Sequence, residues 1–188
     1  MNSSKKTPRI VGVLILLAYA LLGSNNPEQK VMGMFLEAIS GFAVITIAIL
    51  LFPLFKPHNN KASFWYLISR FIEGGLMVIA GILFLANSPQ LLGIRDTIYL
   101  GHGYIFSVAA LIFYYLFYIS KLIPRFISIW GIVASILLIL VMLLQVTKII
   151  PESMIFYLPI ISNEVFLAIW LIVKGFSSVA NAPKSKNE

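Results

Sequence analysis

Six long stretches of this chain are almost entirely apolar, and their length limits what the chain can fold into. A helix of about 20 apolar residues crosses the ~30 Å hydrocarbon core of a bilayer, and most of these stretches reach or exceed that length. The stretches are continuous rather than alternating, which excludes a transmembrane β-barrel. We expect helices at residues 10–23, 32–53, 62–86, 97–119, 126–145 and 154–176.

The composition agrees with a membrane protein. Hydrophobic residues make up 60% of the 188 residues and charged residues only 11%, against about 45–50% and 25% in soluble domains. This balance excludes both a water-soluble globular domain and a disordered chain. The sequence therefore predicts an all-α, polytopic membrane protein, with a six-helix transmembrane domain over residues 1–176. Residues 177–188 are small, polar and charged, and predict a disordered cytoplasmic tail.

Lys and Arg residues between the helices indicate the orientation. With the N-terminus inside, ten of the 14 basic residues fall on inner segments, and only Lys30, Arg95 and Lys148 fall on outer ones. Cytoplasmic segments carry such an excess, so we expect both termini in the cytoplasm. The net charge of +7 is then a topological signal, and we expect no nucleic-acid partner.

The first helix leaves two alternatives open. About 14 residues give a helix of ~21 Å, which is short of a ~30 Å core. Lys5, Lys6 and Arg9 precede it, and Ala18-Tyr19-Ala20 lies near its end, as in a cleaved secretory signal. The alternative is a retained helix that extends back toward Ser3, with its Lys side chains reaching the headgroups.

Five ionisable residues fall within the predicted helices: Glu37, Arg70, Glu73, His102 and Glu164. A charge at the bilayer centre costs about 2.5–3.5 kcal/mol on insertion scales, so such residues face the bundle interior. Glu73 and Glu164 lie near the midplane by residue count, whereas Glu37 and His102 lie ~8 Å from the outer surface. Arg70 and Glu73, three residues apart, share one helix face.

The predicted cluster contains more acid than base. Three carboxyls face the single guanidinium of Arg70, so we expect one carboxyl to hold a proton near neutral pH, His102 to be protonated, or a cation to bind. Glu164 is our candidate proton or cation site, with Arg70 as its gate or anion partner and Glu73 as the competing carboxylate. Asn163 would extend the polar region outward, together with Glu37 and His102.

Local sequence also predicts packing. Helix 32–53 carries a stripe of small residues around Gly41, which favours a close helix contact. Gly74-Gly75 would let another backbone or a ligand approach. Pro159 predicts a kink just before Asn163. Helix 126–145 carries no ionisable side chain, so we expect it to face mainly lipid.

Catalytic and metal motifs are weak. There is no H-E-x-x-H and no G-x-S-x-G, and the chain has two His and no Cys, so we assign no catalytic residue, cofactor or metal. A metal set of Glu37, His102 and Glu164 is weakly supported because zinc sites usually use more His. The leading hypothesis is a small carrier or ligand-binding membrane protein that exchanges protons or binds a cation.

The alternative hypothesis is an accessory or scaffold membrane protein whose buried charges only hold the helices together. An intramembrane enzyme is the least supported of the three classes. The lipid bilayer is the one certain partner.

Three segments resemble a known family: Arg70-x-x-Glu73, LIPRFISIWG at residues 122–131, and LPIISNEVFLAIWLIVKGF at residues 158–176. They are similar to small bacterial membrane proteins catalogued as domain of unknown function 4386. The resemblance implies a six-helix, multi-pass protein of the bacterial plasma membrane and supplies no substrate or cofactor. It places Arg70, Glu73 and Glu164 within the motifs of the family.

Overall fold

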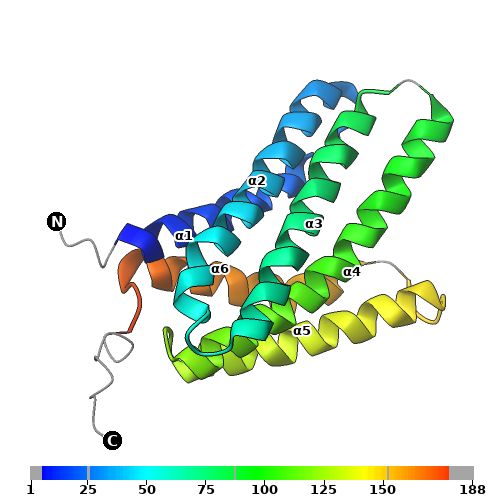
Figure 1. The fold of residues 1–188 in the computed structure, drawn as a ribbon. Helices are drawn as coiled ribbons and strands as arrows, with labels where there is room; N and C mark the ends of the chain where they lie inside the picture. The colour runs from blue at the N-terminus through cyan, green and yellow to red at the C-terminus, as the bar shows by residue number, and fades with distance from the viewer. Residues whose placement is uncertain (1–5, 25, 87, 152, 178–188) are drawn as a thin grey trace, which may run out of the picture.

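The computed structural model describes residues 6–24, 26–86, 88–151 and 153–177, and this part of the chain forms helices joined by short turns (Figure 1). The predicted tail therefore lies outside the described residues except for Ser177. The helices are α1 (Lys6–Ala18), η2 (Tyr19–Gly23), η3 (Pro27–Gln29), α2 (Lys30–Phe55), α3 (Asn60–Phe84), α4 (Pro89–Ser120), α5 (Arg125–Val146), η4 (Met154–Tyr157) and α6 (Leu158–Val173).

Five segments are long and apolar enough to cross a membrane: Lys30–Phe55, Asn60–Phe84, Pro89–Ser120, Arg125–Val146 and Met154–Val173. Their outward faces are apolar as well. On α5, for example, Ile129, Ile136 and Leu143 are each about half exposed, as suits contact with lipid rather than water. The all-helical class is thus confirmed, and the helices are those of a multi-pass membrane protein.

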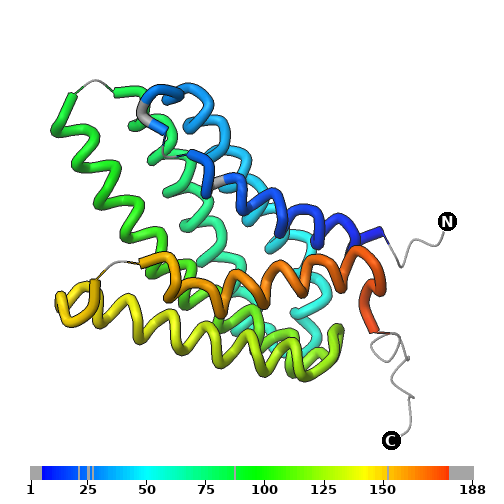
Figure 2. The backbone as a smooth tube through the Cα atoms, turned by 180° about the vertical axis from the view of Figure 1, so that it is seen from behind, coloured from blue at the N-terminus to red at the C-terminus, as the bar shows by residue number. Residues whose placement is uncertain are grey.

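The six α-helices close into a ring. Each packs against its neighbours in sequence, and α1 also packs against α6. Figures 1 and 2 show α2, α3 and α4 side by side, with α1 and α6 lying together across them. From their shared turn near Lys121, α4 and α5 diverge, so that the N-terminal half of α4 lies apart from α5.

Small residues bring α2 and α3 into close contact, as the sequence predicted. A Cβ at Gly41 would lie 2.6 Å from the carbonyl oxygen of Gly74, and a Cβ at Gly74 would lie 2.5 Å from that of Gly41. Only hydrogen fits at these two positions. A Cβ at Gly75 would meet nothing within 4 Å, so this glycine is not needed for the contact.

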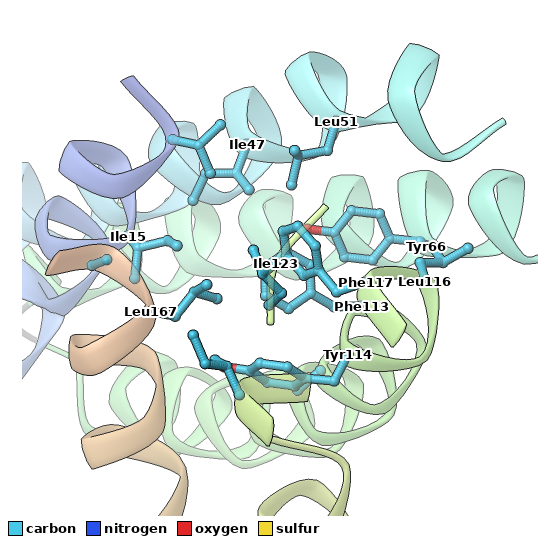
Figure 3. Close-up of a cluster of buried hydrophobic side chains, with 14 of the residues drawn as sticks. Ile15, Ile47, Leu51, Tyr66, Phe113, Tyr114, Leu116, Phe117, Ile123 and Leu167 are labelled. Atoms are coloured by element: carbon cyan, nitrogen blue, oxygen red, sulfur yellow. The ribbon is translucent and has the colours of Figure 1, made fainter. Parts of the chain in front are cut away.

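Aromatic rings fill the end of the bundle where α2 ends and α3 begins (Figure 3). Phe55, Phe113 and Phe117 pack edge to face with centroids 4.7–6.4 Å apart, a geometry that favours ring pairs. Tyr66 stacks on Phe113 at 5.5 Å. Tyr114 covers Gly131 of α5 so closely that any side chain there would collide with its ring.

Two helix boundaries differ from the sequence prediction in ways that matter for the site. α4 begins at Pro89 rather than at residue 97, because Ser88 occupies its N-cap position and a proline fits the first turn. Arg95 is therefore helical, not part of a loop. α6 begins at Leu158, so Pro159 lies in its first turn and starts the helix instead of kinking it.

The other helices agree with the prediction to within a few residues, apart from the first. α1 starts at Lys6 and gives way after Ala18 to the tighter helix η2. After Arg125 at its start, α5 exposes only apolar side chains, and it also buries a stripe that includes Ile127, Ala134 and Leu138.

Candidate functional site

A cavity of about 1010 Å³ opens inside the bundle, and all six α-helices contribute to its wall. It extends from the aromatic cluster, where Phe113 lines it, toward the other end of the bundle, where the N-terminal half of α4, the end of α5 and η4 contribute residues. Asp96 lines it with a side chain that is 75% exposed. The cavity therefore reaches the surface near the start of α4.

Arg70 and Glu73 line this cavity and pair with each other. Nη1 of Arg70 donates to both carboxylate oxygens of Glu73, at 2.8 and 3.0 Å. Arg70 is only 5% exposed, and the rings of Tyr66, Phe106 and Phe113 lie 5.4–5.8 Å from its guanidinium carbon. Its Nε makes no hydrogen bond with any described residue. Both hydrogen bonds of the Arg70–Glu73 pair therefore come from a single guanidinium nitrogen, Nη1.

Glu164 lines the same cavity from α6 and is 9% exposed. Its Oε2 accepts a hydrogen bond of 2.7 Å from the hydroxyl of Tyr19, at the start of η2. Among the described residues it forms no salt bridge. Arg70, Glu73 and Glu164, which were predicted to meet, therefore all line one cavity. Arg70 forms its salt bridge with Glu73, and Glu164 is hydrogen-bonded to Tyr19.

Glu37 has a partner that the sequence analysis missed. Nη2 of Arg95 donates to Oε1 of Glu37 at 2.6 Å, and the hydroxyl of Ser24 donates to the same oxygen at 3.2 Å. Arg95 is 6% exposed and lies 4.2 Å from the centre of the Phe84 ring. The predicted helix start at residue 97 is wrong and left Arg95 in a loop, whereas α4 starts at Pro89, six residues before Arg95.

This pair corrects the charge count. Two buried guanidiniums, not one, face the three carboxyls, so the excess of acid is one charge rather than two. The Ser88-Pro89 start signal could have revealed that Arg95 is helical. No local signal identifies Glu37, 58 residues earlier, as its partner.

The two remaining predicted residues lie in different places. His102 lines the cavity, with its ring 5.6 Å from that of Tyr99. Asn163 is buried between α5 and α6, where its Nδ2 donates to the backbone carbonyl of Ile127 at 3.1 Å. It holds two helices together and is not among the residues that line the cavity.

The described residues do not form a metal centre of the usual kind. No group of three or more His, Asp or Glu side chains in the described ranges comes together closely enough to hold a metal ion. Glu37, His102 and Glu164 are accordingly not assembled as a ligand set. The ionisable groups that line the cavity are carboxylates, two guanidiniums, the imidazole of His102 and phenol groups.

A helical bundle with apolar outward faces and charged groups around an internal cavity defines a polytopic helical membrane protein. Within that class the family is shown by a match to Domain of unknown function (DUF4386) over residues 16–175. The chain belongs to this family, as the resemblance of its segments indicated. No curated protein and no solved structure matches the chain.

Proposed function

We propose that this protein crosses the bacterial plasma membrane six times and that its cavity binds a small ligand or cation in exchange for a proton on Glu164. The observation that supports this most directly is the environment of Glu164. It is a buried carboxyl on the wall of a cavity, and Tyr19 rather than an arginine is its partner among the described residues.

A carboxylate without a counter-charge in a low-dielectric site is unstable, so it takes up a proton or attracts a cation. Glu164 can exchange one for the other because the cavity reaches the surface near Asp96. Glu73 is less suited to this role because Nη1 of Arg70 already holds both of its oxygens. In this mechanism the pairing with Arg70 makes Glu73 the poorer proton acceptor of the two carboxyls.

The sixth span in this proposal is α1 followed by η2. Thirteen α-helical residues at 1.5 Å and five 3₁₀ residues at 2.0 Å reach ~30 Å, about the thickness of a hydrocarbon core. α1 packs between α2 and α6, and a Cβ at Gly12 would collide with the backbone oxygen of Ala168. A retained first span also supplies Tyr19, at the start of η2, to Glu164.

With both termini in the cytoplasm, the cavity opens toward the outside of the cell. The odd-numbered helices then run outward, which places the start of α4 and the end of α5 at the outer surface. Fusing a reporter that is active only in the cytoplasm to the C-terminus tests this orientation, and an inactive reporter would contradict it.

Proton exchange is tested with the purified protein in liposomes that contain a pH-sensitive dye. We expect a pH gradient to decay faster across vesicles with the wild-type chain than across empty vesicles, and Glu164→Gln to abolish the difference. Glu28→Gln is the matched control, because Glu28 is an exposed carboxyl on η3 and its removal leaves the cavity unchanged.

The accessory or scaffold function is the alternative outcome of the same experiment. It is favoured if Glu164→Gln folds and has no effect on proton flux or on the pH dependence of stability, while Arg70→Ala unfolds the protein. In that case the buried charges serve packing alone.

A further inference from the structure

The cavity wall is apolar over most of its area, whereas its charges lie at two places. Aliphatic and Met side chains from all six α-helices contribute to the wall; they include Ile15, Ile47, Met77, Leu100, Met142 and Ile161. Arg70, Glu73 and Glu164 lie together on one part of the lining, and Arg95 and Asp96 lie where α4 begins. A ligand that fills this space has an apolar body.

The charge on the inner group of residues favours a cation. Arg70 and Glu73 neutralise each other, so the carboxylate of Glu164 is left as the net charge of that group. An anion that approached the free Nε of Arg70 would meet two carboxylates in a medium of low dielectric, where like charges repel strongly. A cation would instead supply the counter-charge that Glu164 lacks.

The residues at the mouth of the cavity carry a net negative charge, as the inner group does. Arg95 is held by Glu37 at 2.6 Å, and Asp96 lies 3.4 Å from the other amine of Arg95. The buried carboxylate of Glu37 therefore already neutralises Arg95, and the exposed carboxylate of Asp96 is left as the net charge of these three residues at the entrance. Such a surface raises the local concentration of cations and lowers that of anions.

The size of the cavity separates an organic cation from an inorganic one. A volume of about 1010 Å³ is at the upper end of the ~300–1,000 Å³ range of small-molecule sites. A metal or alkali ion at Glu164 would leave the apolar wall unfilled. An organic cation with hydrocarbon or aromatic groups would bury that wall and meet the carboxylate at the same time.

We infer that the ligand of this cavity is a monovalent organic cation with a large apolar body, bound at Glu164. The inference rests on the proposed function and specifies its ligand class. Binding of one such cation releases one proton from Glu164 to the cavity water, so the charge of the site is unchanged. The apolar body contacts the wall formed by α1, α2, α3 and α5.

Two probes of the same shape and opposite charge test this inference: tetraphenylphosphonium and tetraphenylborate. With the full chain in lipid nanodiscs, and with empty nanodiscs subtracted, we expect the phosphonium to bind and the borate not to bind. Titration in buffers of different ionisation enthalpy should show release of one proton per phosphonium. Lowering the pH should weaken phosphonium binding, because protons compete for Glu164.

Three variants separate the contributions. Glu164→Gln should lower phosphonium affinity by about tenfold or more, which is at least ~1.4 kcal/mol. Asp96→Asn should lower it by only about two- to threefold, since this carboxylate is exposed and screened by salt. Tyr19→Phe keeps the carboxylate of Glu164 and removes its hydrogen bond, so phosphonium binding should be retained. This variant still tests the site if Glu164→Gln does not fold.

The apolar wall has its own control. Tetramethylammonium carries the same charge without the aromatic groups, and we expect it to bind much more weakly than the phosphonium. The inference would be overturned if tetraphenylphosphonium and tetraphenylborate bound equally well. It would also be overturned if Glu164→Gln left phosphonium binding unchanged. Proton flux that depends on Glu164 without phosphonium binding would retain the proposed function and reject this ligand class.

Discussion

Two buried Arg–Glu pairs of the same chemistry differ in what they connect. Arg70 and Glu73 are one turn apart on α3, so their pair joins no two helices. Arg95 of α4 and Glu37 of α2 lie 58 residues apart in sequence, and Ser24 adds a third segment to that pair. The first pair adjusts the charge on a cavity wall, whereas the second holds the bundle together.

The comparison shows why burial alone does not identify a functional charge. Both arginines are about equally buried, and both have an aromatic ring under the guanidinium. What distinguishes them is whether the acidic partner reaches the cavity: Glu73 lines it, and Glu37 is not among the lining residues. A carboxylate beside a cavity can exchange protons with water, whereas one enclosed between helices cannot.

The largest expected effect is at the pair between helices. Arg95→Ala should lower the free energy of unfolding by about 3–5 kcal/mol, because it leaves Glu37 charged, buried and without its counter-ion. Unfolding in mixed micelles, followed by far-ultraviolet circular dichroism, measures this change. Arg125→Ala is the control: Arg125 is exposed at the start of α5, and its loss should cost less than about 1 kcal/mol. If Arg95→Ala and Arg125→Ala lower the free energy of unfolding equally, the Arg95–Glu37 pair does not hold the bundle together.

The next effect concerns the contact between α2, which carries Glu37, and α3, which carries Glu73. Gly74→Val should destabilise the protein by about 1–3 kcal/mol, since a Cβ there lies 2.5 Å from the Gly41 carbonyl and forces α3 away from α2. Thermal unfolding measures it. Gly75→Ala, one residue further on, meets nothing within 4 Å and should be neutral or stabilising by up to about 1 kcal/mol. If Gly75→Ala is as harmful as Gly74→Val, the helix contact is not the cause.

The sequence predicted the positions of the helices better than it predicted which buried side chains pair with one another. Continuous apolar runs identify five spans because lipid requires long helices with internal hydrogen bonds. The same criterion placed the start of α4 too late, because Arg95 and Asp96 interrupt the apolar run although they are helical. A buried arginine at a helix start therefore resembles a loop residue when hydropathy is the only measure.

Residue spacing predicted one of the two buried Arg–Glu pairs, and it did not predict the partners of Glu37 and Glu164. Residue spacing placed Arg70 and Glu73 on one face, and a three-residue separation fixes that pair locally. The partners of Glu37 and Glu164 come from distant segments, so only the tertiary structure reveals them. In the sequence Tyr19 is part of a signal-like Ala-Tyr-Ala segment, and nothing local connects it with a residue of α6.

A smaller effect is expected at the hydrogen bond between Tyr19 and Glu164. Tyr19→Phe should cost about 1 kcal/mol of unfolding free energy, less than Arg95→Ala, because the freed carboxylate oxygen can still reach cavity water. The measurement is chemical or thermal unfolding beside the wild type. Tyr115→Phe is the control, since among the described residues the Tyr115 hydroxyl has a single hydrogen-bond contact, which is long (3.5 Å), exposed and made with Asn59. A loss as large as that of Arg95→Ala would mean that Glu164 is structural like Glu37.

The smallest change in stability is expected when both members of the cavity pair are replaced. Arg70→Met with Glu73→Gln removes two charges and keeps the side-chain volumes similar, and such replacements are often neutral or stabilising. Arg70→Met alone should be worse by about 1–3 kcal/mol, because it leaves Glu73 and Glu164 as two carboxylates on one wall without a cation. A double-mutant cycle on unfolding free energies gives the coupling between the two residues.

The two Arg–Glu pairs should also differ in what their double replacement changes. The double variant at Arg70 and Glu73 keeps Glu164 as the net charge of the site and should still bind tetraphenylphosphonium. The corresponding replacement of Arg95 and Glu37 should loosen the contact between α2 and α4. If the double replacement at Arg70 and Glu73 unfolds the protein, that pair is structural in spite of its place on the cavity wall.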